Sequence, residues 1–312
     1  MSPAILCPLL LTLTAAAGVD PYDQSKVPIE VDTHNPKLAK IVLVAGTPSH
    51  PPGAHEYLAT QAILKGLLEQ TPGVFVAIVR DNWPKNPKIF AGARSIVWYT
   101  DGAKNHPLLQ PARADVIQSY IDKGTGFVAL HYGLNVTKEL GQRMLPWLGG
   151  HFDPEISGGT GAIKWTPVFK TLPVHPITRG VAPFAINDEW YFNMRFVPGM
   201  KGITPLVTGV PPEELRKTED TKKHPGRAEI LAWAYDRPRG GRSFGITTPH
   251  THEDWANEGL RRLVVNAILW TAKVEVPKGG AKVALDLADL EKNLDDKRPK
   301  PTAPTTPTAK TP

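Results

Sequence analysis

The sequence predicts an α/β fold built on a doubly wound, mainly parallel sheet. Three observations indicate this class. Short, continuous apolar runs, which are typical of parallel strands buried on both faces, alternate with amphipathic segments of helical length. The 312-residue chain is 41% hydrophobic and contains eight Trp, enough for a substantial core. Polar clusters rich in histidine follow the apolar runs, where parallel strands would present their carboxyl ends.

Four strands and two helices are predicted in the first part of the chain. Runs of mostly β-branched and aromatic residues predict the strands, at residues 41–45, 74–79, 95–99 and 127–130. A helix is expected at 56–69, because its apolar residues recur at helical spacing before a Thr-Pro-Gly turn. A second helix, at 111–123, opens with a proline and is closed by Gly124.

The middle of the chain, residues 149–226, is rich in Gly and Pro and is predicted to be an irregular insertion with short strands. Strands are expected again at 229–235 and 241–247, and an amphipathic helix at 257–273. Residues 277–312 are predicted to form a tail. A short surface helix is expected within that tail at 285–294, and its Pro-, Thr- and Ala-rich end is expected to be disordered from about 299.

The N-terminus resembles an export signal. Residues 5–14 are mostly apolar, and Ala15-Ala16-Ala17 offers the small side chains that signal peptidase requires, so residues 1–17 are predicted to be a signal peptide. This apolar run is too short to span a bilayer, so no stable membrane anchor is expected. We therefore expect a secreted or periplasmic protein in which residues 18–37 form an extended lead-in.

Composition excludes several kinds of site. The single cysteine, Cys7, lies in the predicted signal peptide, so a mature chain would have no disulfide, no thiolate metal ligand and no cysteine nucleophile. The formal charge of +6 comes from scattered basic residues, and no nucleic-acid partner is expected. The turn at 46–49 lacks the glycine spacing and the lysine of a phosphate loop, so no nucleotide cofactor is expected.

Six of the ten histidines follow predicted strands, and a seventh, His151, lies at the start of the insertion. Ligands of open α/β sheets bind beyond the carboxyl ends of the strands, so the sequence predicts a histidine-rich site. His250 and His252, if extended, would point both imidazoles to one face, a geometry suited to one cation, and His55 is grouped with them as a metal ligand. Adding the carboxylate of Glu189 and either His55 or one of its alternatives, His50 and His131, would form a mixed site for Zn, Mn, Ni or Fe. The alternative is that these groups only hydrogen-bond the loops.

His131, Glu189 and His50 are the candidate catalytic residues. Histidine moves protons near neutral pH, and the Asp188-Glu189 pair could supply an acid and a base for sugar chemistry. The alternative for that pair is a capping or ion-pairing role within the insertion, for instance with Arg195.

Four further side chains are candidate contacts for a small-molecule carbohydrate, since aromatic rings can stack on pyranose faces. They are Asp101, Tyr132, Tyr191 and Trp255. The alternative is that the rings belong to the core and that Asp101-Gly102 makes a turn.

Motifs spread over residues 38–276 resemble the ThuA-like (trehalose-utilisation) family. They are AGTPSH at 45–50 with His55-Glu56, LHYG at 130–133, WLGG at 147–150, DEWY at 188–191, GRSFG at 241–245 with the histidine pair after it, and NAILW at 266–270. The resemblance implies a flavodoxin-like fold similar to the class I glutamine amidotransferases and a link to sugar metabolism.

One departure from the amidotransferases changes the expected chemistry. Those enzymes place a cysteine at the sharp turn after a central strand, whereas His131 stands near that position here, so glutaminase chemistry through a thioester is excluded. We expect instead a lyase, isomerase or hydrolase acting on a keto-sugar or glycoside through a His/Glu pocket, with or without a metal. The alternative is a sugar-binding or assembly module without turnover. The pattern predicts no oligomeric state.

Overall fold

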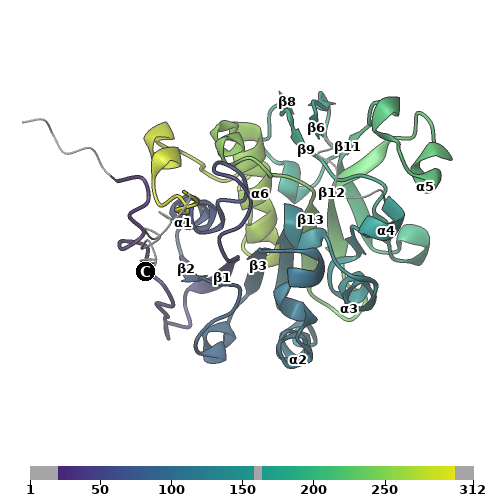
Figure 1. The fold of residues 1–312 in the computed structure, drawn as a ribbon. Helices are drawn as coiled ribbons and strands as arrows, with labels where there is room; N and C mark the ends of the chain where they lie inside the picture. Colours follow the sequence, from purple (N-terminus) through teal and green to yellow (C-terminus); the bar gives the residue numbers. More distant parts are fainter. Residues whose placement is uncertain (1–19, 158–163, 299–312) are drawn as a thin grey trace, which may run out of the picture.

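The computed structural model describes residues 20–157 and 164–298 and has a seven-stranded sheet at its centre (Figure 1). The strand order is β11-β12-β13-β4-β3-β1-β2. The bounds are β1 Ala39–Ala45, β2 Val74–Val79, β3 Ser95–Tyr99, β4 Gly126–Leu130, β11 Ile203–Gly209, β12 Glu229–Asp236 and β13 Arg242–Ile246. Strands β2, β1, β3, β4 and β13 pair in parallel, and β12 and β11 continue the sheet in antiparallel pairs. The predicted mixed α/β fold with a mainly parallel sheet is confirmed.

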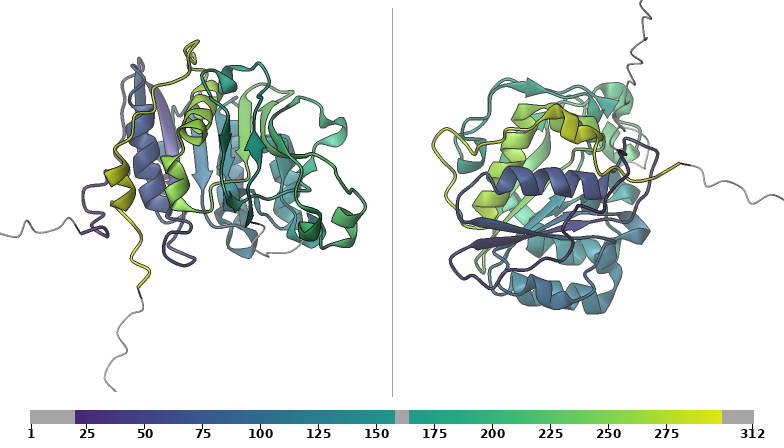
Figure 2. Two further views of the ribbon diagram at one scale, coloured as in Figure 1. Left: turned by 90° about the horizontal axis from the view of Figure 1, so that it is seen from above. Right: turned by 90° about the vertical axis from the view of Figure 1, so that its left-hand side faces the viewer.

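Helices cover both faces of the sheet (Figure 2). One face carries α1 Tyr57–Leu68 and α6 Glu258–Thr271, and the other carries α2 Pro111–Ile121 and α3 Lys138–Leu148. Strand β1 contributes to both cores because successive side chains of a strand point to opposite faces. Its Ile41 and Leu43 pack in the core under α1 and α6, whereas Val42 and Val44 pack in the core next to α2 and α3. Among the described residues, no helix is long and apolar enough to cross a membrane.

The predicted strands and the three predicted long helices are all present, with ends shifted by two residues at most. Two of the longer elements, α3 and β11, have no counterpart in the sequence prediction. Helix α3 carries Leu140, Met144, Trp147 and Leu148 at helical spacing, but its Gly141 and Pro146 are poor helix formers and argue against a helix in the sequence. Strand β11 contains Pro205 and pairs with β12 through register shifts, so it lacks a clean strand pattern. The predicted insertion therefore includes an edge strand of the central sheet.

The rest of the insertion has the irregular character that the sequence indicates. It contains β5 Gly150–His151, α4 Pro154–Ser157, β6 Lys164–Trp165, β7 Val168–Phe169, β8 Phe184–Ala185, β9 Asp188–Glu189, β10 Arg195–Phe196 and α5 Glu219–Lys222. The two-residue strands pair with one another rather than with the central sheet.

The segment after α6 packs on the domain instead of trailing from it. Val283 and Leu290 are buried in the core beside α1, and a 3-10 turn at Leu287–Glu291 stands where the short surface helix is predicted. The lead-in has little regular structure and forms one bridge, between Ile29 and Ile78 of β2. The predicted signal peptide and the predicted disordered end lie outside the described residues.

Candidate metal centre

Three histidines meet beyond the carboxyl ends of β1, β4 and β13. His55 lies near the end of the loop between β1 and α1, His131 directly follows β4, and His250 follows β13. The Nε2 atom of His55 lies 2.9 Å from Nδ1 of His250 and 3.1 Å from Nε2 of His131, which is 3.2 Å from Nδ1 of His250. Nothing in local sequence brings these rings together. The parallel sheet does, because it presents these three loops at one edge.

The backbone at these positions is unusual. His131 has a φ of 45°, His55 of 51° and the neighbouring His50 of 65°. Residues with a Cβ atom rarely adopt such angles, and they persist where the surrounding structure enforces them, often at functional sites. At His131 this conformation turns the chain sharply out of β4 and leaves the imidazole fully buried beside the other two.

The tautomer of His55 is fixed by its neighbours. Its Nδ1 lies 2.9 Å from the hydroxyl of Tyr57, and that hydroxyl donates to Oδ1 of Asp101 at 3.1 Å. Because the hydroxyl has one hydrogen, the His55 Nδ1–H must be the donor to Tyr57. Ser49 donates to the same carboxylate oxygen at 2.7 Å. Nε2 of His55 therefore presents a lone pair to the centre of the cluster.

His131 is oriented in the same way by the backbone. Its Nδ1 donates to the carbonyl oxygen of Thr247 at 2.8 Å, so its Nε2 also carries a lone pair. Two lone pairs 3.1 Å apart cannot hydrogen-bond each other. The lone pairs can accept a hydrogen from Nδ1–H of His250 and, on His131, from the Tyr191 hydroxyl 3.4 Å away, or they can bind a cation placed among the three nitrogens while His250 carries its hydrogen on Nε2. Metal-bound histidines characteristically donate their second nitrogen to a carbonyl or a carboxylate-linked group.

Electrostatics keep these rings neutral. Burial lowers the pKa of His131 to about 3, although the nearby Asp188 carboxylate acts in the opposite direction. Burial, reinforced by the neighbouring histidines, places the pKa of His55 far below its usual value, and burial also lowers the pKa of His250. The neutral imidazole is the form that binds metal, so the cluster needs no deprotonation at pH 7.

The three nitrogens fit a divalent metal. Tetrahedral Zn–N bonds of about 2.0–2.1 Å would separate two ligand nitrogens by about 3.3 Å, only a few tenths of an ångström more than the separations observed. Three histidines with one open position are also a typical donor set of catalytic zinc. His55, His131 and His250 could therefore hold a metal ion.

The other predicted catalytic residues surround this cluster. Oε2 of Glu189 lies 3.8 Å from Nδ1 of His250, and burial together with Asp188 raises the pKa of Glu189 to about 7. His50 is exposed, and its ring centroid lies 3.7 Å from that of His55. Arg195 pairs with Asp220, so the predicted alternative of an ion pair between Arg195 and the Asp188-Glu189 pair is not observed.

Both tyrosines predicted to contact substrate also lie here. The Tyr132 ring is partly exposed, with its centroid 5.2 Å from that of His55. The Tyr191 ring is buried and stacks on His131 with 4.6 Å between centroids, and its hydroxyl lies 3.4 Å from Nε2 of His131. Of the two, Tyr132 has the more accessible ring.

Two predicted site residues are not part of the cluster. The chain turns into a 3-10 helix at His252, so His250 and His252 do not share one face as an extended chain would require. His252 is buried, and its Nδ1 lies 3.2 Å from the hydroxyl of Thr60 on α1. Trp255 is fully buried and donates to the same hydroxyl, which is the core role that the sequence left open. Both side chains hold the loop that follows β13 against α1.

Two residues that orient the histidines of the cluster are not identified by the sequence. Tyr57 gives a weak signal, as a polar aromatic residue two positions after a histidine, whereas the carbonyl of Thr247 gives none. Asp188 has a different role from the proposed acid or base, because its fully buried carboxylate accepts hydrogen bonds from Thr248, His250 and Thr251. It holds the loop that carries His250.

We expect the metal-free protein to lose stability as the pH falls from 7 to 5. Buried histidines with lowered pKa take up protons near pH 6.5 only in the unfolded chain, so each lowers the free energy of unfolding by up to about 1.4 kcal/mol per pH unit. These are His55, His106, His131 and His252, with His250 acting in the same direction.

Carboxyl groups with raised pKa act in the opposite direction, because the folded state holds their protons to higher pH. They are Glu189, Asp254 and Asp295, with pKa values of about 7, 8 and 6. The histidines outnumber them, so destabilisation in acid should prevail. Thermal melts at pH 7, 6 and 5 check this, and a melting temperature that is constant or rises in acid would contradict it.

Comparison with known proteins gives the family. A family model named ThuA and described as trehalose utilisation matches residues 42–271. A solved structure described as ThuA-like, from Parabacteroides merdae ATCC 43184, is 19% identical with a TM-score of 0.54, over 82% of this chain and 99% of that one. Another from Bacteroides uniformis ATCC 8492 is 16% identical with a TM-score of 0.51, over 77% and 93%. At such identities the likeness concerns the fold alone. A search of curated proteins found no match.

The matched residues include most of the central sheet and all three histidines of the cluster. The resemblance predicted from the motifs is thereby confirmed. The chain belongs to the ThuA family, described as trehalose utilisation.

Proposed function

We propose that the protein is an exported, metal-dependent enzyme acting on a small carbohydrate of the keto-sugar or glycoside class. The proposal rests on one observation. The Nε2 atoms of His55 and His131 each carry a lone pair, and they face each other 3.1 Å apart in a buried site. The family's link to trehalose utilisation supports a sugar as substrate. The predicted signal peptide supports export.

We also propose that the fold is related to the flavodoxin-like fold of the class I glutamine amidotransferases. The parallel strands lie in the order β2-β1-β3-β4-β13, which corresponds to the flavodoxin-like order 2-1-3-4-5. In this relationship His131, at the turn after β4, occupies the place of the amidotransferase cysteine, and the chemistry changes from thiol attack to metal and proton chemistry.

A divalent metal held by His55, His131 and His250 would supply a Lewis acid that polarises a sugar carbonyl or hydroxyl. The chain's own residues prepare the site for it. The Tyr57–Asp101 pair and the Thr247 carbonyl hold two rings in the ligating tautomer. Asp101 is thus assigned to the support of His55 rather than to substrate.

Glu189 is the proposed general base. Its carboxylate lies at the edge of the cluster, and a pKa of about 7 balances its ionised form and its basicity near neutral pH. From this position Oε2 can take a proton from a carbon or hydroxyl next to a carbonyl group. Such proton transfer is common to lyase and isomerase steps on keto-sugars. His50 and Tyr132, which are exposed or partly exposed, are the proposed sugar contacts.

Replacing Glu189 by glutamine tests this assignment. We expect turnover to fall by about 100-fold or more, while metal content stays unchanged, because the amide keeps the shape of the side chain but cannot accept the proton. A base must be ionised, so wild-type kcat should rise with pH through the pKa of Glu189, which a bound cation would hold below the value of about 7 that it has without metal, and the variant should lack this rise. Trehalose and its keto derivatives are suitable first substrates.

The matched control is Glu253→Gln, which changes an exposed carboxylate on the loop after His252. It should leave turnover and pH profile intact. Elemental analysis of the purified wild-type protein completes the test. Protein that carries no metal after purification or after incubation with Zn²⁺, Mn²⁺, Ni²⁺ or Fe²⁺, and that binds sugar unchanged, would reject the enzyme in favour of a sugar-binding module.

A further inference from the structure

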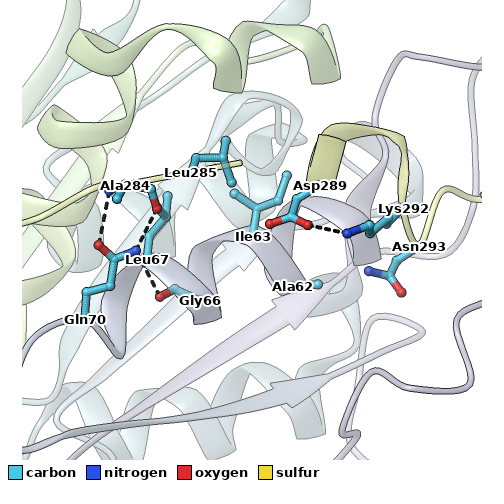
Figure 3. Close-up of a pocket in the computed structure, with 10 residues that line it drawn as sticks. All are labelled: Ala62, Ile63, Gly66, Leu67, Gln70, Ala284, Leu285, Asp289, Lys292 and Asn293. Carbon is cyan, nitrogen blue, oxygen red and sulfur yellow. Dashed lines mark hydrogen bonds and ion pairs between the residues drawn. The ribbon is translucent and has the colours of Figure 1, made fainter. Parts of the chain in front are cut away.

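The segment that follows α6 lies outside the residues matched by the family, 42–271, yet it runs along α1 (Figures 1 and 3). Near the C-terminal end of α1, the Gln70 side chain exchanges two hydrogen bonds with the backbone of Ala284, at 2.8 and 3.1 Å. A groove of about 360 Å³ separates helix and segment between Gln70 and Asn293 (Figure 3). The segment then continues to the N-terminal end of α1, where His55 lies.

Contacts with the His55 loop begin where this groove ends. The amide of Asp295 donates to Oε2 of Glu56 at 2.7 Å. The ammonium group of Lys297 donates to Oε1 of Glu56 at 3.0 Å and to the carbonyl oxygens of Ala54 and His55 at 2.5 and 3.2 Å. An ammonium group has three hydrogens, and all three are used here. Lys297 therefore has no donor left for a substrate.

These contacts are buried. The side chain of Lys297 is 6% exposed and that of Glu56 1%. Glu56 also accepts from the amide of Gly53 at 2.9 Å, so one ion pair ties the segment to the whole turn from residue 53 to 56. His55 stands inside this turn with a φ of 51°, a conformation that the isolated chain would leave. The Lys297 contact with the His55 carbonyl opposes that relaxation.

We propose that Lys297 is a positioning residue that holds His55 in the orientation required for metal binding. The C-terminal segment thereby completes a site whose ligands all come from the family-matched part of the chain. This inference rests on the metal site proposed above. Without the ammonium group, the turn can relax and carry the imidazole away from His131 and His250. Loss of a group that orients a ligand typically weakens metal binding by about 10–100-fold.

The test compares Lys297→Met with Lys292→Met in the full chain. Lys292 lies in the same segment, but it is half-exposed and pairs with Asp289 (Figure 3). We expect Lys297→Met to bind Zn²⁺ at least about tenfold more weakly in a chelator competition. Amide hydrogen exchange at residues 53–57 should accelerate, because the turn is no longer held. Lys292→Met should match wild type in both measurements.

A buried, unpaired Glu56 could prevent Lys297→Met from folding. The double variant Glu56→Gln, Lys297→Met removes both charges and still lacks the contact with His55, so it should fold and bind Zn²⁺ weakly. Wild-type Zn²⁺ affinity in either folded variant would overturn the inference, whether or not exchange accelerates. If wild type binds no metal, the proposed function fails. Amide hydrogen exchange then provides the test. Unchanged exchange rates at residues 53–57 would overturn the placement of His55 by Lys297. Rates that rise only in the variants that lack Lys297 would support it.

Discussion

Replacing His250 by alanine should weaken the binding of divalent metal by at least about 100-fold while changing the free energy of unfolding by about 1 kcal/mol or less. The ring supplies one of three candidate ligands, and two imidazoles alone make a poor site. The stability change should be small because the ring is partly exposed and contributes little to the core. Chelator competition and urea denaturation of the metal-free protein measure the two effects.

His252→Ala is the matched control, since it removes the same side chain two residues away. We expect the opposite result. Its buried ring contacts Thr60, so its loss should lower the free energy of unfolding by about 1–3 kcal/mol and leave metal affinity per folded molecule intact. If His250→Ala binds metal as tightly as His252→Ala, with both at the wild-type affinity, His250 is not a ligand.

Replacing Asp188 by alanine should lower the free energy of unfolding by about 3–5 kcal/mol. The carboxylate is fully buried and accepts from the hydroxyl of Thr248, from the amide of His250 at 2.8 Å, and from the amide and hydroxyl of Thr251 at 3.2 and 3.1 Å. Alanine would leave these buried and part-buried donors without an acceptor, which costs more than the bonds themselves contribute. Urea denaturation of the metal-free protein is the measurement.

The same variant should also bind metal more weakly, because the freed loop no longer fixes His250. Asp115→Ala is the control: that carboxylate is exposed and its ion pair with Arg143 should contribute at most about 1 kcal/mol. A stability loss for Asp188→Ala no larger than for Asp115→Ala would show that the loop holds itself.

Most of the central fold is predictable because burial imposes a pattern on the sequence. A strand covered on both faces, such as β1, is apolar over most of its length, here from Ile41 to Ala45, and this is visible without any tertiary information. Strand β11 lies at the sheet edge, where register shifts and Pro205 are tolerated, so no pattern is imposed. In helix α3, Gly141 and Pro146 speak against a helix, and Gly141 is explained only by the close approach of the His151 ring, which the sequence does not reveal.

For the candidate site, the sequence predicts only which strands its residues follow. The sequence indicates that histidines follow β1, β4 and β13, and sheet topology then places their loops together. Which rings meet depends on backbone turns that single residues decide, and the turn after His250 sends His252 to α1 instead. Lys297, 242 positions from His55, carries no local pattern that links it to the site.

The spacing of the three histidines along the chain gives a bound metal the properties of a cross-link. His55 and His131 are 76 positions apart, and His131 and His250 are 119 positions apart. In the unfolded chain, binding one ion with such distant residues would close two long loops, and the loss of chain entropy would weaken the binding. In the folded chain the three residues are already together. The ion would therefore bind almost exclusively to the folded chain, and a concentration 100 times its Kd would add about 2.7 kcal/mol to stability. Metal supply would then govern how long the folded protein persists.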